Sequence, residues 1–126
     1  MADDNAPTGI ELVPLATVTV TGGDRYRIDD GPFGNRIIAG ISSGRWEGER
    51  LSGSIVGPGG DWAMPGPGGA MLLDVRQTVE TDDGAVIYME YKGIGLDGAT
   101  KITTAPLFQT GDERYAWLNH VVAVAR

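Results

Sequence analysis

The segment from Met71 to Lys92, MLLDVRQTVETDDGAVIYMEYK, constrains the fold of this chain more than any other stretch. Two runs in which apolar and polar residues alternate meet at Asp83-Gly84. This pair suits the positive φ angles of a tight, two-residue type I′ turn. The segment therefore predicts a β-hairpin, with strands at about 70–80 and 85–93.

A turn at Asp83-Gly84 fixes which side chains share a face of this hairpin. It places Arg76 opposite Tyr91 and gives two faces, one with Asp74, Arg76, Thr78, Ile87, Met89 and Tyr91, the other with Val75, Gln77, Val79, Thr81, Val86, Tyr88, Glu90 and Lys92. The second face carries a glutamine, a glutamate and a lysine, so we expect it to face water. Asp74 and Arg76 would then point inward, where charges are costly unless they are paired. We interpret them as the lead to a functional site.

The rest of the chain also indicates β-structure, because twenty glycines and seven prolines separate short runs rich in Val, Ile, Thr and Tyr. We expect further strands at about 11–20, 24–29, 36–41, 50–56, 99–104 and 114–124. Turn signals separate them, such as Thr21-Gly22-Gly23, Ser42-Ser43-Gly44 and Asp97-Gly98. Short strands at this spacing predict an all-β fold, a single antiparallel β-barrel of about eight strands. An interior of that size is filled by side chains or holds one small ligand.

Length, charge and composition bound the organisation and the partners. A chain of 126 residues suits one domain with a single core, here residues 10–126 after a disordered tail at 1–9. The net charge of -7 argues against nucleic acid and anionic membranes as partners. There is no cysteine, and the first residues, MADDNAPTG, lack the apolar region of a secretory signal. No apolar run approaches the roughly 20 residues of a membrane helix, so we expect a cytoplasmic protein.

The last predicted strand, RYAWLNHVVAVAR, adds candidates to the site. Its face with Arg114, His120 and Arg126 looks solvated, so Tyr115, Trp117 and Asn119 would point inward. An inward asparagine needs hydrogen-bond partners. Asp74, Arg76 and Tyr91 could supply them, which predicts a polar cluster in an aromatic and aliphatic chamber. The face with Leu118, Val122 and Val124 is apolar enough to favour a homodimer or a higher homo-oligomer.

A glycine- and proline-rich stretch, GPGGDWAMPGPGG at residues 57–69, is expected to be a loop. Asp61 and Trp62 at its centre are candidates for a pocket mouth, with the aromatic ring covering a ligand. They fit equally well as a loop cap and a plug at one end of the barrel. The stretch lacks the GK[ST] ending of a phosphate-binding loop, which excludes nucleotide binding of that kind.

Other catalytic and metal-binding patterns are missing from the sequence. His120 is the single histidine and lies on the solvated face, so a Ser-His-Asp arrangement has no clear base. One histidine without cysteine excludes an ordinary zinc site, and the acids around Asp30 and Asp83 are turn residues rather than calcium ligands. Glu47 and Glu49 fit an exposed strand edge. We expect neither a metal nor a cofactor.

Several short motifs, in this order and spacing, give the chain a family resemblance over about residues 10–124. They are Gly44-Arg45-Trp46-Glu47-Gly48, Leu51-Ser52-Gly53, Gly59-Gly60-Asp61-Trp62, Leu73-Asp74-Val75-Arg76, Thr81-Asp82-Asp83-Gly84-Ala85, Tyr91-Lys92-Gly93 and Arg114-Tyr115-Ala116-Trp117-Leu118-Asn119. The chain resembles the DUF3237 family, small bacterial and fungal proteins named as a domain of unknown function. The resemblance implies a lipocalin-like or allene-oxide-cyclase-like antiparallel β-barrel. The glycine-rich segment 63–70 departs from the family pattern.

Three functions fit these residues. The first is a cofactor-independent isomerase, cyclase or lyase acting on a small, partly apolar carbonyl or phenolic compound inside the barrel. Asp74 would transfer the proton, Arg76 would stabilise an anionic oxygen, and Tyr91 and Asn119 would donate hydrogen bonds. The substrate would be held by Asp61, Trp62, Met89, Tyr115 and Trp117. The second function is a non-catalytic carrier of a small hydrophobic ligand. The third possibility is a satisfied internal polar network without a ligand.

Overall fold

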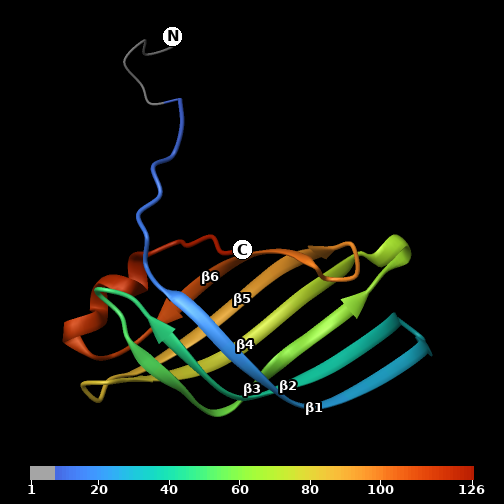
Figure 1. Cartoon of the computed structure of the whole chain (residues 1–126), viewed down its shortest axis with the longest axis horizontal. Coiled ribbons are helices and arrows are strands. Elements are labelled where there is room, and N and C mark those ends of the chain that lie inside the picture. The colour runs from blue at the N-terminus through green and yellow to red at the C-terminus, as the bar shows by residue number, and fades with distance from the viewer. Residues whose placement is uncertain (1–7) are drawn as a thin grey trace.

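The computed structural model describes residues 8–126 and shows one antiparallel sheet of six strands (Figure 1). The strands are β1 (Thr17–Gly31), β2 (Gly34–Glu47), β3 (Gly53–Pro65), β4 (Met71–Thr81), β5 (Val86–Leu96) and β6 (Lys101–Gln109), and each pairs with the next. Two 3₁₀ segments, η1 (Pro67–Gly69) and η2 (Glu113–His120), complete the elements. Residues 1–7 of the tail predicted at 1–9 lie outside the described residues.

The prediction of an all-β, antiparallel fold is confirmed, but the prediction of a single barrel of about eight strands is not. In residues 8–126 the sheet has six strands, and β1 does not pair with β6. The strands predicted at 11–20 and 24–29 are one strand, β1, because the glycines at 22 and 23 form a bulge there instead of a turn. A bulge inserts extra residues into one strand and bends it without ending it. For the same reason β2 continues through the turn predicted at 42–44.

The glycine-rich stretch 57–69 is not a loop for most of its length. β3 runs through it to Pro65, with a bulge between Val56 and Gly60 where Gly57 takes a φ of 69°. Glycine adopts this left-handed conformation without steric cost. Since successive side chains of a strand point to opposite faces, Asp61 and Trp62 are separated by the sheet.

The segment predicted as a strand at 114–124 is mostly helical. Asp112 starts η2, and its Oδ1 accepts a hydrogen bond of 2.9 Å from the backbone N–H of Arg114. Short polar side chains at this position satisfy the free N–H groups of a helix start. After η2 the chain is extended again, and Ala125 exchanges two backbone hydrogen bonds with Thr104 of β6.

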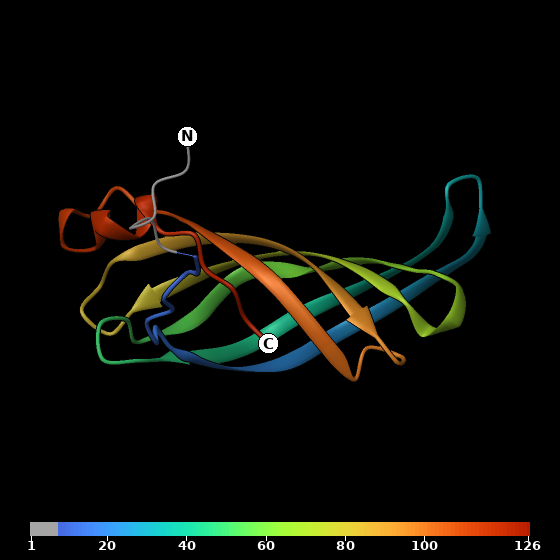
Figure 2. The ribbon, with the colours of Figure 1, turned by 90° about the horizontal axis from the view of Figure 1, so that it is seen from above.

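The sheet curls, so that its concave face holds the core. The core is built from Trp46, Leu51, Ile55, Val79, Ile87, Met89, Phe108 and Leu118. η2 lies beside the β4–β5 turn at one end of the sheet, where Leu118 seals the core, and the strands spread apart toward the other end (Figures 1 and 2). η2 therefore lies at one end of the sheet, and the β1–β2 turn lies at the other end. In the part of the chain that the structure describes, no helix is long and apolar enough to cross a bilayer.

The β4–β5 hairpin is present, but its turn is one residue longer than predicted. Glu80 lies opposite Val86 and Gln77 opposite Met89, and the tip is Asp82-Asp83-Gly84, where Gly84 has a φ of 93°. This shift of one residue turns every β4 side chain to the opposite face relative to β5. Val75, Gln77 and Val79 therefore line the concave face, and the prediction that Asp74 and Arg76 point inward is wrong.

Candidate functional site

Two of the predicted site residues, Asp61 and Tyr91, come together on the concave face. Directly opposite residues of antiparallel strands share a face. The strand register gives one continuous row of such residues across the sheet: Arg25, Ala39, Asp61, Val75, Tyr91 and Pro106. Arg25, Asp61 and Tyr91 are the polar members of this row, and small or aliphatic residues separate them.

A chain of hydrogen bonds within the concave face orients the hydroxyl group of Tyr91. The Nε1 of Trp46 donates to the Oε1 of Gln77 at 2.7 Å, and the Nε2 of Gln77 donates to the Oη of Tyr91 at 2.5 Å. The indole nitrogen can only donate, so it fixes which end of the Gln77 amide faces Tyr91. The Tyr91 oxygen is thereby an acceptor within the protein, and its own proton remains free to be donated elsewhere.

The surroundings of Tyr91 keep this proton on the oxygen. Burial, together with the negative charge of Asp61, raises the pKa of Tyr91 from 10.0 to about 12, and the hydrogen bond from Gln77 opposes this rise. A phenol with such a pKa is fully protonated at neutral pH. Tyr91 is therefore a hydrogen-bond donor or a weak acid, not a phenolate nucleophile.

Asp61 is a half-buried carboxylate with one oxygen engaged. Its Oδ1 accepts a hydrogen bond of 3.0 Å from the backbone N–H of Asp74 on the neighbouring strand. Within residues 8–126 its second oxygen, Oδ2, has no hydrogen bond. Burial raises the pKa of Asp61, and the charge of Asp74 adds to this, while the Asp74 backbone N–H and Arg25 lower it. A carboxylate with a raised pKa is a better proton acceptor than a fully solvated one.

A cavity of about 650 Å³, lined mostly by apolar residues but also by Glu11, Arg50 and Arg126, lies next to this row, along the seam between β1 and β6. The segments 10–16 and 121–126 form its walls, and Trp46, Pro106 and Phe108 line it from the concave face. Pro106 lies directly opposite Tyr91, and Trp46 begins the hydrogen-bond chain that ends there. The volume is in the range of small-molecule sites. Apolar space therefore adjoins the polar row.

Four other predicted site residues lie away from the concave face. Asp74, Arg76 and Trp62 are on the convex face, where the guanidinium of Arg76 lies 5.8 Å from the centre of the Trp62 ring. Asn119 is exposed in η2, and its side chain exchanges two hydrogen bonds with the backbone of Thr110. The predicted cluster of Asp74, Arg76, Tyr91 and Asn119 therefore does not form.

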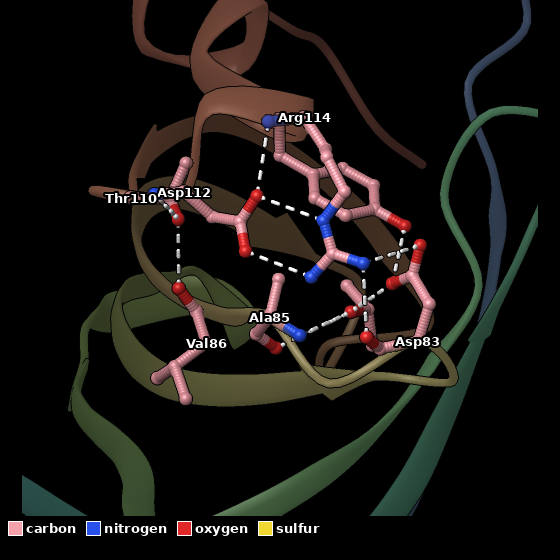
Figure 3. A network of polar contacts seen from close by, with 8 residues as sticks. Asp83, Ala85, Val86, Thr110, Asp112 and Arg114 are labelled. Carbon is pink, nitrogen blue, oxygen red and sulfur yellow. Dashed lines mark hydrogen bonds and ion pairs between the residues drawn. The ribbon is translucent and has the colours of Figure 1, made fainter.

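The remaining predicted residues have structural surroundings. Met89 is fully buried in the core, and the ring of Trp117 lies 3.7 Å from the guanidinium carbon of Arg50. Tyr115 donates a hydrogen bond of 2.8 Å to Asp83, which also pairs with Arg114 (Figure 3). The contacts of Tyr115 and Arg114 with Asp83 tie η2 to the β4–β5 turn at one end of the sheet.

Sequence reasoning missed three members of the site, namely Trp46, Gln77 and Arg25. Gln77 alternates with Val75 and Val79, which is the pattern of a buried face. Because Gln77 is polar, the sequence pattern assigned this face to solvent instead. Trp46 belongs to the motif Gly44-Arg45-Trp46-Glu47-Gly48, to which the sequence assigned no role, and no sequence pattern pointed to Arg25. Within residues 8–126, no group of three His, Asp or Glu side chains could hold a metal ion.

The fold and the site define a class, a curled antiparallel β-sheet with a row of polar residues across its concave face. A family model described as "Protein of unknown function (DUF3237)" matches residues 10–126. The chain therefore belongs to the DUF3237 family, as its motifs predicted.

The proteins that resemble this chain include a relative that is named as an enzyme. A UPF0311 protein of Rhodopseudomonas palustris (strain TIE-1) is 30% identical over 125 residues, which covers 86% of this chain and 82% of the relative. The hydroalkoxylation enzyme phnH of Penicillium herquei is 28% identical over 117 residues, covering 93% of this chain and 74% of the enzyme. The crystal structure of a β-barrel-like protein from Acinetobacter baumannii AYE has a TM-score of 0.72 at 28% identity, over 90% of this chain and 87% of that one.

Proposed function

We propose that this protein is a cofactor-independent acid/base enzyme that adds the O–H bond of a substrate hydroxyl group across a carbon–carbon double bond conjugated to a carbonyl in the same molecule. The observation that carries the proposal is the hydrogen-bond chain, which leaves the proton of Tyr91 free on the concave face, two strands from the carboxylate of Asp61. Similarity to a hydroalkoxylation enzyme supports the same reaction class.

The two groups have complementary roles in such an addition. The Oδ2 of Asp61 removes the hydroxyl proton, and the substrate oxygen attacks the distal carbon of the double bond. As the carbon–oxygen bond forms, the π electrons move to the carbonyl oxygen, and Tyr91 donates a hydrogen bond to the resulting enolate. Protonated Asp61 then returns its proton to the carbon next to the carbonyl, so the product is an isomer of the substrate. No other reactant is consumed.

The cyclisation of 2′-hydroxychalcone tests this assignment, because its phenol adds intramolecularly to a conjugated double bond with a change in absorbance. We expect Asp61→Asn and Tyr91→Phe each to lower the rate above background by a factor of about 10²–10⁴, which is typical of a lost acid or base. Asp74→Asn is the matched control, since its carboxylate lies on the convex face and should be dispensable. Equal rates for the Asp61 and Asp74 variants would refute the assignment.

The seam cavity favours a second candidate function, that of a carrier for a small apolar ligand. A carrier needs the cavity but not the free proton of Tyr91 or the open oxygen of Asp61. Recovery of a bound ligand in chemically unaltered form, by mass spectrometry after incubation, would favour the carrier. Formation of an isomer of equal mass but different chromatographic retention would favour the enzyme.

A further inference from the structure

Arg25 is the third polar member of the row on the concave face, on the edge strand β1. Arg25 on β1 lies opposite Ala39 on β2, which lies opposite Asp61 on β3. The only side chain between Arg25 and Asp61 in this row is therefore the methyl group of Ala39. Neighbouring strands are about 4.8 Å apart, which places β1 about 10 Å from β3 along the sheet. The positive charge of Arg25 is close enough to act on Asp61, whose pKa it lowers.

Among residues 8–126, the guanidinium of Arg25 has no partner, in contrast to those of the neighbouring arginines. Arg27 pairs with Asp29 at 2.6 Å, and Arg36 donates a hydrogen bond of 3.0 Å to the backbone oxygen of Trp62. Within residues 8–126, Arg25 makes no side-chain hydrogen bond or ion pair. An exposed arginine without a protein partner presents its full set of donors to a ligand.

The arrangement also solves an electrostatic problem. Asp61 and a net charge of -7 repel an anion that approaches the concave face. A guanidinium two strands from Asp61 offsets this repulsion and binds a carboxylate through two parallel hydrogen bonds. A neutral substrate would need no such group at this place.

We propose that Arg25 is the anion-recognition residue of this site, and that its substrates are flat, conjugated carboxylates. The carboxylate pairs with Arg25, the conjugated body lies over Ala39 and Val75, and the reacting end lies between Asp61 and Tyr91. This inference rests on the proposed function for the position of the reacting end. The binding of the carboxylate does not depend on any reaction.

Calorimetric titration with two probes of the same shape tests the proposal, namely 2-naphthoate and neutral 2-naphthylmethanol. We expect Arg25→Gln to weaken the binding of 2-naphthoate about tenfold, in line with the loss of a charge-assisted pair. Binding of 2-naphthylmethanol should change less than about twofold, and Arg25→Lys should restore part of the difference. Arg27→Gln is the matched control on the same strand, and it should leave both affinities unchanged.

Two outcomes would overturn the proposal. One is equal binding of 2-naphthoate to the wild type and to Arg25→Gln, and the other is no measurable binding of 2-naphthoate to the wild type. The 2-naphthoate titration with Arg25→Gln involves no turnover, and the cyclisation of 2′-hydroxychalcone with Asp61→Asn and Tyr91→Phe involves no carboxylate. If the anion site is wrong, the cyclisation rate should still depend on Asp61 and Tyr91. If the proposed function is wrong, the affinity for 2-naphthoate should still depend on Arg25.

Discussion

Replacing Gln77 by leucine tests the hydrogen-bond chain on which the site depends. Gln77 is 1% exposed and bonds both Trp46 and Tyr91. The substitution removes two hydrogen bonds of about 1 kcal/mol each and leaves the indole N–H of buried Trp46 without a partner, at a further cost of about 1–3 kcal/mol. The added apolar side chain offsets about 1 kcal/mol of this. We therefore expect the free energy of unfolding to fall by about 3 kcal/mol.

The size of the effect makes it measurable by thermal and urea unfolding. With an unfolding entropy of about 2.1 cal/mol/K per residue, a chain of 126 residues loses about 10 °C in Tm for a change of about 3 kcal/mol. The matched control is Gln109→Leu, because Gln109 is exposed on the convex side of β6 and makes no side-chain hydrogen bond within residues 8–126. Its stability should change by less than about 0.5 kcal/mol.

A double-mutant cycle with Trp46→Phe separates the stranded N–H from the general cost of altering a core. Phenylalanine has no indole N–H, so the double variant avoids the unpaired donor that Gln77→Leu creates. The two single costs should exceed the cost of the double variant by at least about 1 kcal/mol. If the costs of the two single substitutions add to within about 0.3 kcal/mol, or if the Gln77→Leu protein is as stable as the wild type, the proposed hydrogen-bond chain is refuted.

Two further predictions concern Tyr91 and η2. The pKa of Tyr91 is raised from 10.0 to about 12, so the unfolded chain loses this proton at a lower pH than the folded protein. The stability that Tyr91 contributes is therefore present below pH 10 and is lost toward pH 12. In urea unfolding at several pH values, Tyr91→Phe should reduce this loss of stability by about 2 kcal/mol. Leu118→Ala should cost about 3 kcal/mol because Leu118 is fully buried, whereas Val122→Ala, at an 80% exposed position, should cost less than about 0.5 kcal/mol. An unchanged alkaline profile, or equal costs for the two alanine variants, would contradict these expectations.

The hairpin at the centre of the chain shows how far sequence reasoning reaches. The alternation of apolar residues and the pair Asp83-Gly84 correctly predicted two paired strands and a glycine with positive φ. They did not determine the length of the turn. Thr81 decides it, because its Oγ1 accepts a hydrogen bond from the backbone N–H of Ala85 and donates one to Asp83, which stabilises the three-residue tip.

That single residue of turn length had a large effect on the predicted site. Since a shift of one position exchanges the two faces of a strand, Asp74 and Arg76 moved outward and Gln77 moved inward. The sequence placed Gln77 on the solvent-facing side of the hairpin because its amide is polar. Its partners, Trp46 and Tyr91, come from other strands and satisfy the amide inside the protein. Such pairing depends on tertiary contacts, so local alternation could not reveal it.

The polar groups of the concave face differ systematically in how much of their hydrogen-bonding capacity the protein uses. Near the core, Trp46 and Gln77 are bonded to each other, and Tyr91 accepts one bond while keeping its own proton free. Asp61 has one oxygen engaged by the backbone N–H of Asp74, and its second oxygen has no hydrogen bond within residues 8–126. A network that served only stability would be saturated throughout, because unpaired polar groups at partly buried positions are costly. The free capacity of Tyr91 and Asp61, both partly buried, indicates groups held in place for a bound molecule.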